Sequence, residues 1–540
     1  MTSNLDIVLG YHARSKHHLQ RYAAGPRGLD WATQPDPFRH FIGAPRVELP
    51  LLAPGHPATT WAESLKASGL SPRPLGVASV AALLELALGL AAWKAYAGSR
   101  WALRCNPSSG NLHPTEGYLV IQDCPGLDDG VYHYLSRDHV LERRAVLEAS
   151  APLLPSSCLL VGLSAIAWRE AWKYGERAFR YCQHDAGHAA AALRFAAATL
   201  GWQARLLEGA ADADIAALLG LDRTPDFQDA EGEHPDLVLL VGPGPLPADW
   251  PLKPLIEATR DWRGRANRLS PHHAHDWPVI EEVAQATRKP ATQAWVWTPP
   301  LRPPPAPEGG DVPAARLIRQ RRSAQAFDGT TGASLAAFHS MLDLTLPRPD
   351  FAPFDALSWA PRVHLVLFVH RVEGLAPGLY VLPRRPEAEA ELRTAFSPAF
   401  AWQRAEDTPA HLPLYRLHAG DARAAARILS CHQDIAADGA FAVAMLAEFA
   451  GPLKAGPWIY RQLHWEAGLI GQVLYLAAEA AGLQGTGIGC FFDDATHELL
   501  GLAGTALQDL YHFTVGAALE DSRLQTLPAY AHLRRPAGLP

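Results

Sequence analysis

The chain has 540 residues, a formal net charge of −7, 48% hydrophobic residues and 19% charged residues. This composition supports large hydrophobic cores and excludes wholesale disorder. A mildly acidic chain without a basic block is a poor candidate for binding nucleic acid or an anionic membrane. The six cysteines contain no CxxC pair, and no apolar stretch follows the N-terminus. We therefore expect a cytoplasmic protein without a signal peptide, a disulfide framework or a cysteine-rich zinc site.

Along the chain, the most apolar stretch is residues 77–93, which predicts a buried helix rather than a membrane span because Ser79 and Glu85 interrupt it. Eight prolines then fall within residues 290–313. Proline lacks the amide donor and restricts φ, so this part should be an extended, semi-rigid linker. Runs rich in β-branched and aromatic residues on both sides of it predict strands at 118–122, 237–241, 364–369 and 511–515. We divide the chain into a first domain, a linker and a second domain, at 1–285, 286–313 and 314–540.

The two halves contain the same landmarks in the same order. The segment DAGHAAAALRFAAATLG at 185–201 aligns with EAGLIGQVLYLAAEAAG at 466–482, and the pattern GLxxGxY begins at Gly126 and again at Gly374. Near the starts, Arg14-Ser15 resembles Arg322-Ser323, although two residues are a weak match. Any Ala-rich helix that ends in glycine resembles another, but several ordered landmarks favour a duplication.

Both repeated helices are apolar nearly all round, which predicts that they are buried. Gly187 in the first helix and Gly468 and Gly471 in the second would let helix backbones approach closely. Two duplicated, buried helices are what a fused pseudo-twofold dimer would place at its centre. The expected fold class is α+β, with one unit made twice.

Three segments contain residue types that suit a phosphate-bearing heteroaromatic ligand. In RRSAQAF at 321–327, the arginine fork matches a phosphate, although a solvated helix end reads the same way. In PSSGN at 107–111, hydroxyls and an amide sit in a turn, although an ordinary surface turn has the same composition. The GTGIGC segment at 485–490 predicts a glycine-rich turn that a ligand can approach closely, and its GxGxG spacing is not a Rossmann fingerprint.

Together these landmarks resemble the FMN-dependent nitroreductase-like superfamily, and within it the SagB-type dehydrogenases, which are azoline oxidases and their relatives. The resemblance rests on YHARSKHHLQRYAAGPRGLDW with QPDPFRHF after it, PSSGNLHPTEGYL, KYGERAFRYCQHDAGHA and GIGCFFDD, and it spans nearly the whole chain outside the linker. Single-unit members form dimers with FMN at the interface. The resemblance therefore implies two tandem nitroreductase-like domains, each an antiparallel sheet flanked by helices, in a pseudo-dimer that is monomeric or pairs again.

The resemblance implies one FMN site with its two halves from different domains. The second domain would hold the phosphate and ribityl and approach the isoalloxazine with Arg321, Ser323, Gln325, Gly485, Gly487, Ile488, Gly489 and Arg523. The first would supply Pro107, Ser108, Ser109 and Asn111. Gln325 stands where a basic residue is common. A mirror site would need Arg14, Ser15 and a second PSSGN, but residues 352–361 read APFDALSWAP. We therefore expect one FMN per chain.

The resemblance also implies catalytic roles for Lys173 and Tyr174, because azoline-oxidising relatives have a Lys-Tyr pair at this place. A partly desolvated lysine can take a proton from carbon, and the tyrosine can orient or relay it. The alternative without a catalytic role is a solvent-exposed lysine beside a tyrosine that only packs against its neighbours. We expect no metal, because His184 and His188 alone are half of a zinc site. The roles of Lys16, His17 and His18 stay open.

The expected function is an FMN-dependent oxidoreductase that passes hydride from a peptide-derived heterocycle or a small organic substrate to flavin N5. Oxygen is a candidate acceptor, and peptide-modifying enzymes are candidate partners. One alternative is an NAD(P)H-dependent nitro or quinone reductase. Another is a flavin-binding scaffold of a peptide-modifying complex that performs no turnover.

Overall fold

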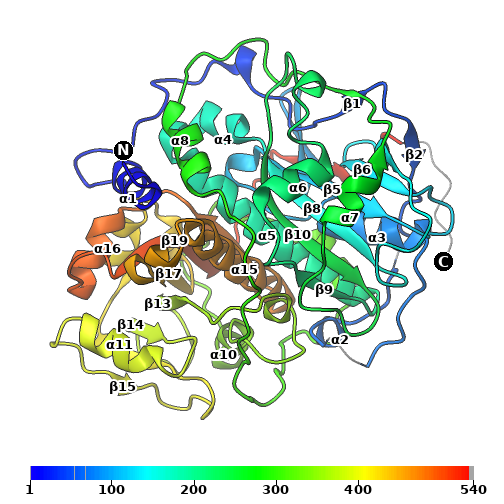
Figure 1. The fold of residues 1–540 in the computed structure, drawn as a ribbon. Helices are drawn as coiled ribbons and strands as arrows, with labels where there is room; N and C mark the ends of the chain where they lie inside the picture. Colours follow the sequence, from blue (N-terminus) through cyan, green and yellow to red (C-terminus); the bar gives the residue numbers. More distant parts are fainter. Residues whose placement is uncertain (1, 54, 67–68, 534–540) are drawn as a thin grey trace.

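Two antiparallel sheets lie on either side of a central pair of helices in the computed structural model of the chain, which describes residues 2–53, 55–66 and 69–533 (Figure 1). The first sheet has the strand order β11-β7-β6-β5-β8-β10-β9, with β2 also pairing with β7. Its strands are β2 (Arg46–Glu48), β5 (Thr115–Ile121), β6 (Gly130–Leu135), β7 (Val140–Leu147), β8 (Leu159–Ala165), β9 (Gln203–Leu206), β10 (His234–Gly242) and β11 (Thr259–Arg260).

The second sheet has the order β15-β16-β14-β13-β17-β19-β18. Its strands are β13 (Val363–Val369), β14 (Gly378–Leu382), β15 (Gln403–Arg404), β16 (Tyr415–Ala419), β17 (Phe441–Glu448), β18 (Gln484–Ile488) and β19 (Leu507–Gly516). The two sheets share one topology, because the order β6-β5-β8-β10-β9 of the first corresponds strand for strand to β14-β13-β17-β19-β18 of the second. Strands covered on both faces read as continuous apolar runs, as in β8 and β13, and all four predicted strands are confirmed.

The central helices are α5 (Ala178–Thr199) and α15 (Ile459–Ala480), each 22 residues long, and they pack against each other (Figure 1). Glycine is required where they cross. A Cβ at Gly187 would overlap the backbone of Trp465, and a Cβ at Gly468 would overlap the carbonyl oxygen of His184. The predicted burial of both helices and their close approach are therefore confirmed.

The repeated GLxxGxY pattern builds the same turn twice. Gly126 has φ 85° and Gly374 has φ 73°, values that favour glycine. Six residues after each glycine, a tyrosine hydroxyl closes the turn: that of Tyr132 donates to the Asp128 carbonyl oxygen at 2.6 Å, and that of Tyr380 donates to the Ala376 carbonyl oxygen at 2.6 Å. The sequence repeat is therefore also a structural repeat.

The predicted helix over 77–93 is wrong after its first part. Helix α3 (Val77–Ala87) is buried as predicted, but the chain then enters β3 (Leu90–Tyr96). A Cβ at Gly89 would lie 2.5 Å from the Glu85 carbonyl oxygen, so glycine permits this sharp change. Strand β3 pairs with β4 (Ser99–Arg104) and with β20 (Gln525–Pro528), which brings the C-terminal segment onto the first half.

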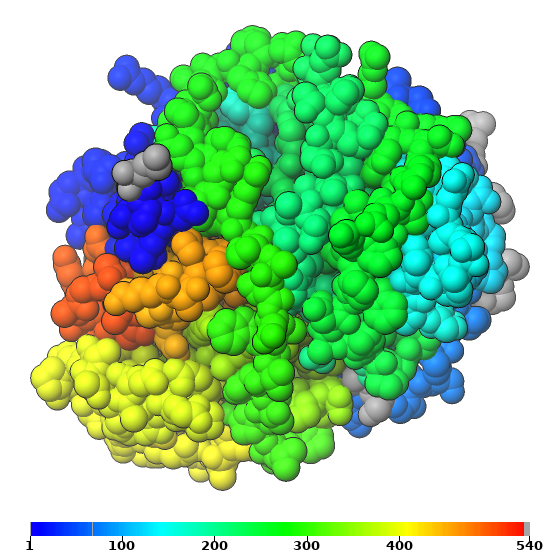
Figure 2. Space-filling model, viewed as in Figure 1, coloured from blue at the N-terminus to red at the C-terminus, as the bar shows by residue number. Residues whose placement is uncertain are grey.

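No helix or strand occurs within residues 287–313, which connect α8 (Pro278–Ala286) to α9 (Ala314–Gln320), and residues 308–311 form a turn near their end. In Figure 2, a green band in the colour of residues near 300 crosses the visible face between the two halves. The remaining elements are α1 (Asn4–Arg14), α2 (Trp61–Ser64), α4 (Ala167–Tyr174), α6 (Asp212–Leu219), α7 (Lys253–Ala258), α10 (Leu335–Asp343), α11 (Ala388–Ala395), α12 (Arg423–Leu429), α13 (Ile435–Asp438), α14 (Ala450–Ala455), α16 (Asp493–Leu500), β1 (Phe41–Ile42) and β12 (Arg265–Ala266).

One hydrophobic core runs through both halves, from Val8 to Val515, and includes both central helices. The halves therefore share this central core, and each also buries a smaller core of its own on the outer face of its sheet. Among the described residues, we find no helix with the length and apolar character needed to cross a membrane.

Candidate active site

A cavity of about 550 Å³ lies between the two halves. The first half contributes the loop after β4 and the end of α4, and the second contributes the segment after α9, strand β18 and residues near 520. Its lining includes most of the predicted site residues, namely Pro107, Ser108, Ser109, Asn111, Tyr174, Arg321, Ser323, Gln325, Gly487, Ile488 and Gly489. Three predicted residues, Lys173, Gly485 and Arg523, do not line it.

Two arginines place positive charge on the cavity wall. Arg321 is 4% exposed, and its guanidinium donates to the carbonyl oxygens of Arg104 at 3.0 Å and Cys105 at 3.3 Å. Arg322 is half-buried and donates to the Ala91 carbonyl oxygen at 3.3 Å. Burial lowers the pKa of both guanidiniums. Within the described part of the chain, neither forms an ion pair with a carboxylate, although Glu479 is close enough to interact electrostatically with both.

Gly485–Ile488 is an edge strand, so the prediction of a glycine-rich turn is wrong. Strand β18 pairs with β19, and Gly485 also bridges to Ser323. The glycines are needed because aromatic side chains lie against this backbone. A Cβ at Gly487 would overlap the Tyr511 hydroxyl, and one at Gly489 would overlap the Tyr181 ring. The strand thus presents its backbone at the cavity wall, as a ligand-approach role requires.

Tyr475 of α15 joins Ser323 to this strand, although the sequence did not single it out. Its hydroxyl lies 2.8 Å from Ser323 Oγ and accepts a hydrogen bond from the Gly487 amide at 2.9 Å. The guanidinium of Arg321 lies 4.9 Å from the centre of the Tyr475 ring. One buried tyrosine therefore positions three of the predicted residues.

The 107–111 loop has an unusual backbone, with φ values of 59° at Gly110, 60° at Asn111 and 54° at His113. Its own side chains hold it in this shape. Ser108 Oγ accepts from the His113 amide at 2.8 Å, and Asn111 Nδ2 donates to the Ala102 carbonyl oxygen at 2.9 Å. Non-glycine residues in the left-handed region persist only where their surroundings fix them, and such sites cluster at functional loops.

Asp185 of α5 anchors the same loop. Its Oδ1 accepts from the Ser109 amide at 3.1 Å and from Ser109 Oγ at 3.0 Å. The carboxyl is buried, and burial raises its pKa to about 7. The sequence offered one signal for this residue, because it is the acid that opens the repeated helix motif.

Asp185→Asn should remove a pH dependence of stability. The folded protein binds this proton more tightly than the unfolded chain, where an aspartate has a pKa of 3.8. The carboxyl therefore stabilises the fold at low pH and loses this contribution as the pH rises toward 7. In urea unfolding of the apoprotein, the asparagine variant should gain stability relative to wild type between pH 4 and pH 7. A constant difference across that range would show that Asp185 does not titrate there.

Lys173 and Tyr174 end α4 and pack against the 107–111 loop. A Cβ at Gly110 would lie 2.5 Å from the Tyr174 hydroxyl oxygen and 3.0 Å from Lys173 Nζ. Lys173 Nζ lies 5.2 Å from the centre of the Tyr174 ring. Burial raises the pKa of Tyr174 well above its usual value, so its hydroxyl stays protonated. Two elements predicted separately, the Lys-Tyr pair and the PSSGN segment, thus meet at one wall.

Arg523 lies at the outer rim. Its side chain is 70% exposed and pairs with Asp521 at 2.7 Å, and its guanidinium lies 5.7 Å from the centre of the Tyr96 ring. Its neighbours Ser522 and Leu524 line the cavity.

At the mirror position, a loop of the second half packs directly on the first. The Ala352 amide donates to the Leu65 carbonyl oxygen at 2.9 Å. Glu466, the counterpart of Asp185, accepts from the Arg362 amide at 3.0 Å and pairs with buried Arg384. Arg14 is exposed and pairs with Glu176, so it takes no place equivalent to that of Arg321.

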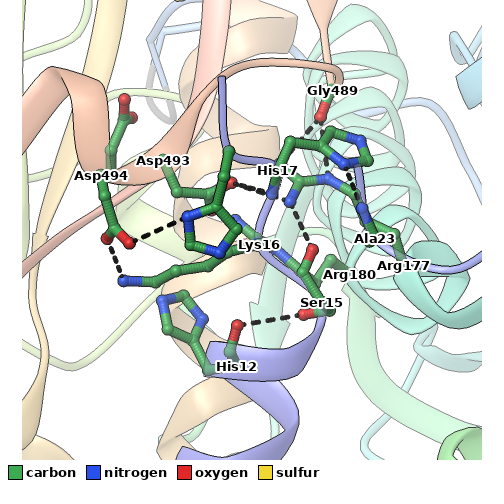
Figure 3. Close-up of polar contacts among 12 residues, drawn as sticks. His12, Ser15, Lys16, His17, Ala23, Arg177, Arg180, Gly489, Asp493 and Asp494 are labelled. Atoms are coloured by element: carbon green, nitrogen blue, oxygen red, sulfur yellow. Dashed lines mark hydrogen bonds and ion pairs between the residues drawn. The ribbon is translucent and has the colours of Figure 1, made fainter. Parts of the chain in front are cut away.

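Residues 15–23 fasten the N-terminal segment to the second half (Figure 3). Lys16 Nζ pairs with Asp494 at 2.6 Å, and the His17 amide donates to Asp493 at 3.0 Å. Buried Arg177 pairs with Asp493 at 2.9 Å and donates to the carbonyl oxygen of Gly489 at 3.1 Å. This cluster lies directly behind the cavity wall formed by Gly489.

Comparisons with known proteins connect this architecture to one family. Residues 318–517 match the sequence model of the nitroreductase family. The chain is 32% identical over 176 residues to the trifolitoxin-processing protein TfxB of Rhizobium leguminosarum bv. trifolii, covering 29% of this chain and 47% of TfxB. It is 29% identical over 104 residues to MJ1384 of Methanocaldococcus jannaschii, which is named as a nitroreductase, covering 18% of this chain and 52% of that protein. The chain thus matches about half the length of these relatives.

A crystal structure of an Anabaena variabilis protein assigned to the nitroreductases superimposes on both halves. The alignment has a TM-score of 0.67 with 22% sequence identity and covers 95% of this chain and 99% of that chain. The chain therefore has the nitroreductase fold, and its residues 318–517 match the nitroreductase family.

Proposed function

We propose that the chain is an FMN-dependent oxidoreductase of the SagB type, which takes hydride from a peptide-derived heterocycle or a small organic substrate. The observation that carries this proposal is one cavity lined by two arginines, by the PSSGN loop and by Tyr174, with Lys173 packed beside the same loop. The similarity to TfxB, a protein named for processing trifolitoxin, supports a peptide-derived substrate and peptide-modifying partner enzymes.

The cavity residues fit FMN on three counts. Its volume of about 550 Å³ lies within the usual range for cofactor sites. Arg321 and Arg322 offer the positive charge that a phosphate needs. Asn106 Oδ1 is buried on the cavity wall without a hydrogen-bond partner among the described residues, so it is free to accept from a ligand. FMN, when bound, supplies the hydride acceptor.

The protein would contribute orientation and a proton acceptor. Arg321, Arg322 and Ser323 would hold the phosphate end, and the 107–111 loop would contact the flat ring. Lys173 would take a proton from the substrate carbon, and Tyr174, which stays protonated, would orient the reacting group by donating a hydrogen bond. The decayed mirror position, with its Arg384–Glu466 pair, supports a single site per chain.

Lys173→Ala should slow reduction of the flavin by substrate roughly 100- to 10,000-fold, the usual contribution of general base catalysis. The flavin spectrum should stay unchanged, because Lys173 is not one of the residues proposed to hold FMN. Stopped-flow absorbance of the bound flavin, with thiazoline and oxazoline peptides as substrates, measures this rate. Lys454→Ala is the matched control, because Lys454 is the lysine at the corresponding place in the second half and should be dispensable.

The same assay separates the alternatives. Fast turnover of NAD(P)H with nitroaromatics or quinones that ignores Lys173→Ala would favour a nitro or quinone reductase. Tight flavin binding without reduction by either class of substrate would favour a scaffold role in a peptide-modifying complex.

A further inference from the structure

Two of the six cysteines meet at the cavity wall. Cys490 follows β18 and lines the cavity, and Cys431 follows α12. The segments around them lie side by side, because the Phe492 amide donates to the Leu429 carbonyl oxygen at 2.8 Å and Gln433 Nε2 donates to that of Cys490 at 3.1 Å. Both cysteines are half-buried and their side chains interact with each other, while the other four cysteines are buried.

A backbone hydrogen bond fixes the ring of His17, which lies near this pair of cysteines. The Ala23 amide donates to His17 Nδ1 at 2.9 Å, so in the neutral ring the proton is on Nε2. The His17 side chain interacts with the Cys490 thiol. The guanidinium of Arg177 lies beside His17 and donates two hydrogen bonds to the Gly489 carbonyl oxygen (Figure 3).

These contacts make the two sulfurs chemically different. Hydrogen bonds from Cys431 and His17 lower the pKa of Cys490 to about 5, whereas the same hydrogen bond to Cys490 raises the pKa of Cys431. The other titratable and charged groups that face the pair are Arg177, Asp493, Tyr22, Tyr174 and Tyr181. One thiolate beside one protonated thiol is the arrangement of an attacking and a resolving cysteine.

We propose that Cys490 and Cys431 form a redox-active dithiol that a hydroperoxide converts to a disulfide at the cavity wall. The Cys490 thiolate attacks the peroxide oxygen, the O–O bond breaks, and the departing hydroxide takes a proton to become water. The Cys431 thiol then attacks the sulfenic sulfur, loses its proton and expels a second water. Two thiols are oxidised and one peroxide is reduced.

This inference does not depend on the flavin chemistry. If FMN binds in the cavity as proposed, its re-oxidation by oxygen would supply hydrogen peroxide there. The disulfide would join the segment after α12 to the wall formed by residues 489–490 and so change the shape of the site.

Controlled oxidation tests the proposal on the full chain. The reduced protein is treated with a small molar excess of hydrogen peroxide, denatured, and its free thiols are counted and mapped by mass spectrometry. The six thiols of the chain should fall to four, with Cys431 linked to Cys490. Cys490→Ser should keep its five thiols, and Cys431→Ser should stop at a dimedone-reactive sulfenic acid on Cys490. Cys158→Ser, the control, should still lose two thiols.

Retention of all six thiols, or equal thiol loss in wild type and Cys490→Ser, would overturn the proposal. The rate of alkylation at pH 6 adds an independent test. His17→Gln should slow the reaction of Cys490 with iodoacetamide roughly tenfold or more, because the thiolate loses a hydrogen-bond donor. Lys16→Ala is the matched control, since it removes the Asp494 pair of the same segment but leaves His17 in place. An unchanged rate in His17→Gln would contradict the assigned role of His17.

Discussion

Arg321→Ala should weaken FMN binding roughly 10- to 100-fold. A charge-assisted contact to a phosphate is worth about 1.5–3 kcal/mol, and each 1.4 kcal/mol is about a factor of ten in affinity. Arg321 is buried, is fixed by two carbonyl oxygens and forms no ion pair with a carboxylate among the described residues. Quenching of flavin fluorescence, titrated with apoprotein, measures the dissociation constant.

Two other arginines complete this experiment. Arg14→Ala should leave FMN affinity unchanged, because Arg14 pairs with Glu176 outside the cavity. Arg523→Ala should weaken binding less than Arg321→Ala, since Arg523 is exposed at the rim and already pairs with Asp521. A loss from Arg14→Ala as large as that from Arg321→Ala would mean that the first half also binds flavin.

Gly468→Ala should destabilise the whole molecule by about 1–3 kcal/mol or more, the usual cost of overpacking a close-packed core. The added methyl group would overlap the backbone of α5, and a backbone cannot move aside as a flexible side chain can. Because one core runs through both halves, α5 and α15 should separate only when both halves unfold. Urea unfolding followed by circular dichroism measures the change.

Gly451→Ala is the matched control for this helix glycine. It lies in α14, and a Cβ there would meet nothing within 4 Å. Alanine is a better helix former than glycine, so this variant should be as stable as wild type or gain up to about 1 kcal/mol. Equal stability of Gly468→Ala and Gly451→Ala would contradict the close crossing of the central helices.

Patterns local in sequence predicted much of the fold. The apolar helices with their small residues, the repeated GLxxGxY turn and the proline-rich connection each depend on neighbouring residues, and each is present in the structure. The helix over 77–93 failed because Gly89 allows the chain to turn into β3, which forms a hairpin with the neighbouring β4 and also pairs with β20, more than 400 residues away. No short window contains the pairing with β20, although the β3–β4 hairpin is local.

The sequence identified many of the residues that line the cavity, but not how they are arranged around it. The glycines of β18 suggested a turn, and only Tyr511 and Tyr181 packed beneath them explain why side chains are excluded from a strand. Asp185, Tyr475 and the pairing of Cys431 with Cys490 went unnoticed because each partner is brought in by tertiary packing. The assignment of FMN, the catalytic pair and the domain boundaries stays a prediction.

Flavin stoichiometry tests the central claim most directly. The purified chain is denatured, its released flavin is identified by chromatography and quantified by absorbance, and the apoprotein is then titrated with FMN. We predict a yellow protein with one FMN per chain that rebinds one FMN after removal. A colourless protein that cannot be reconstituted with FMN would contradict the account, and two FMN per chain would contradict the single-site assignment.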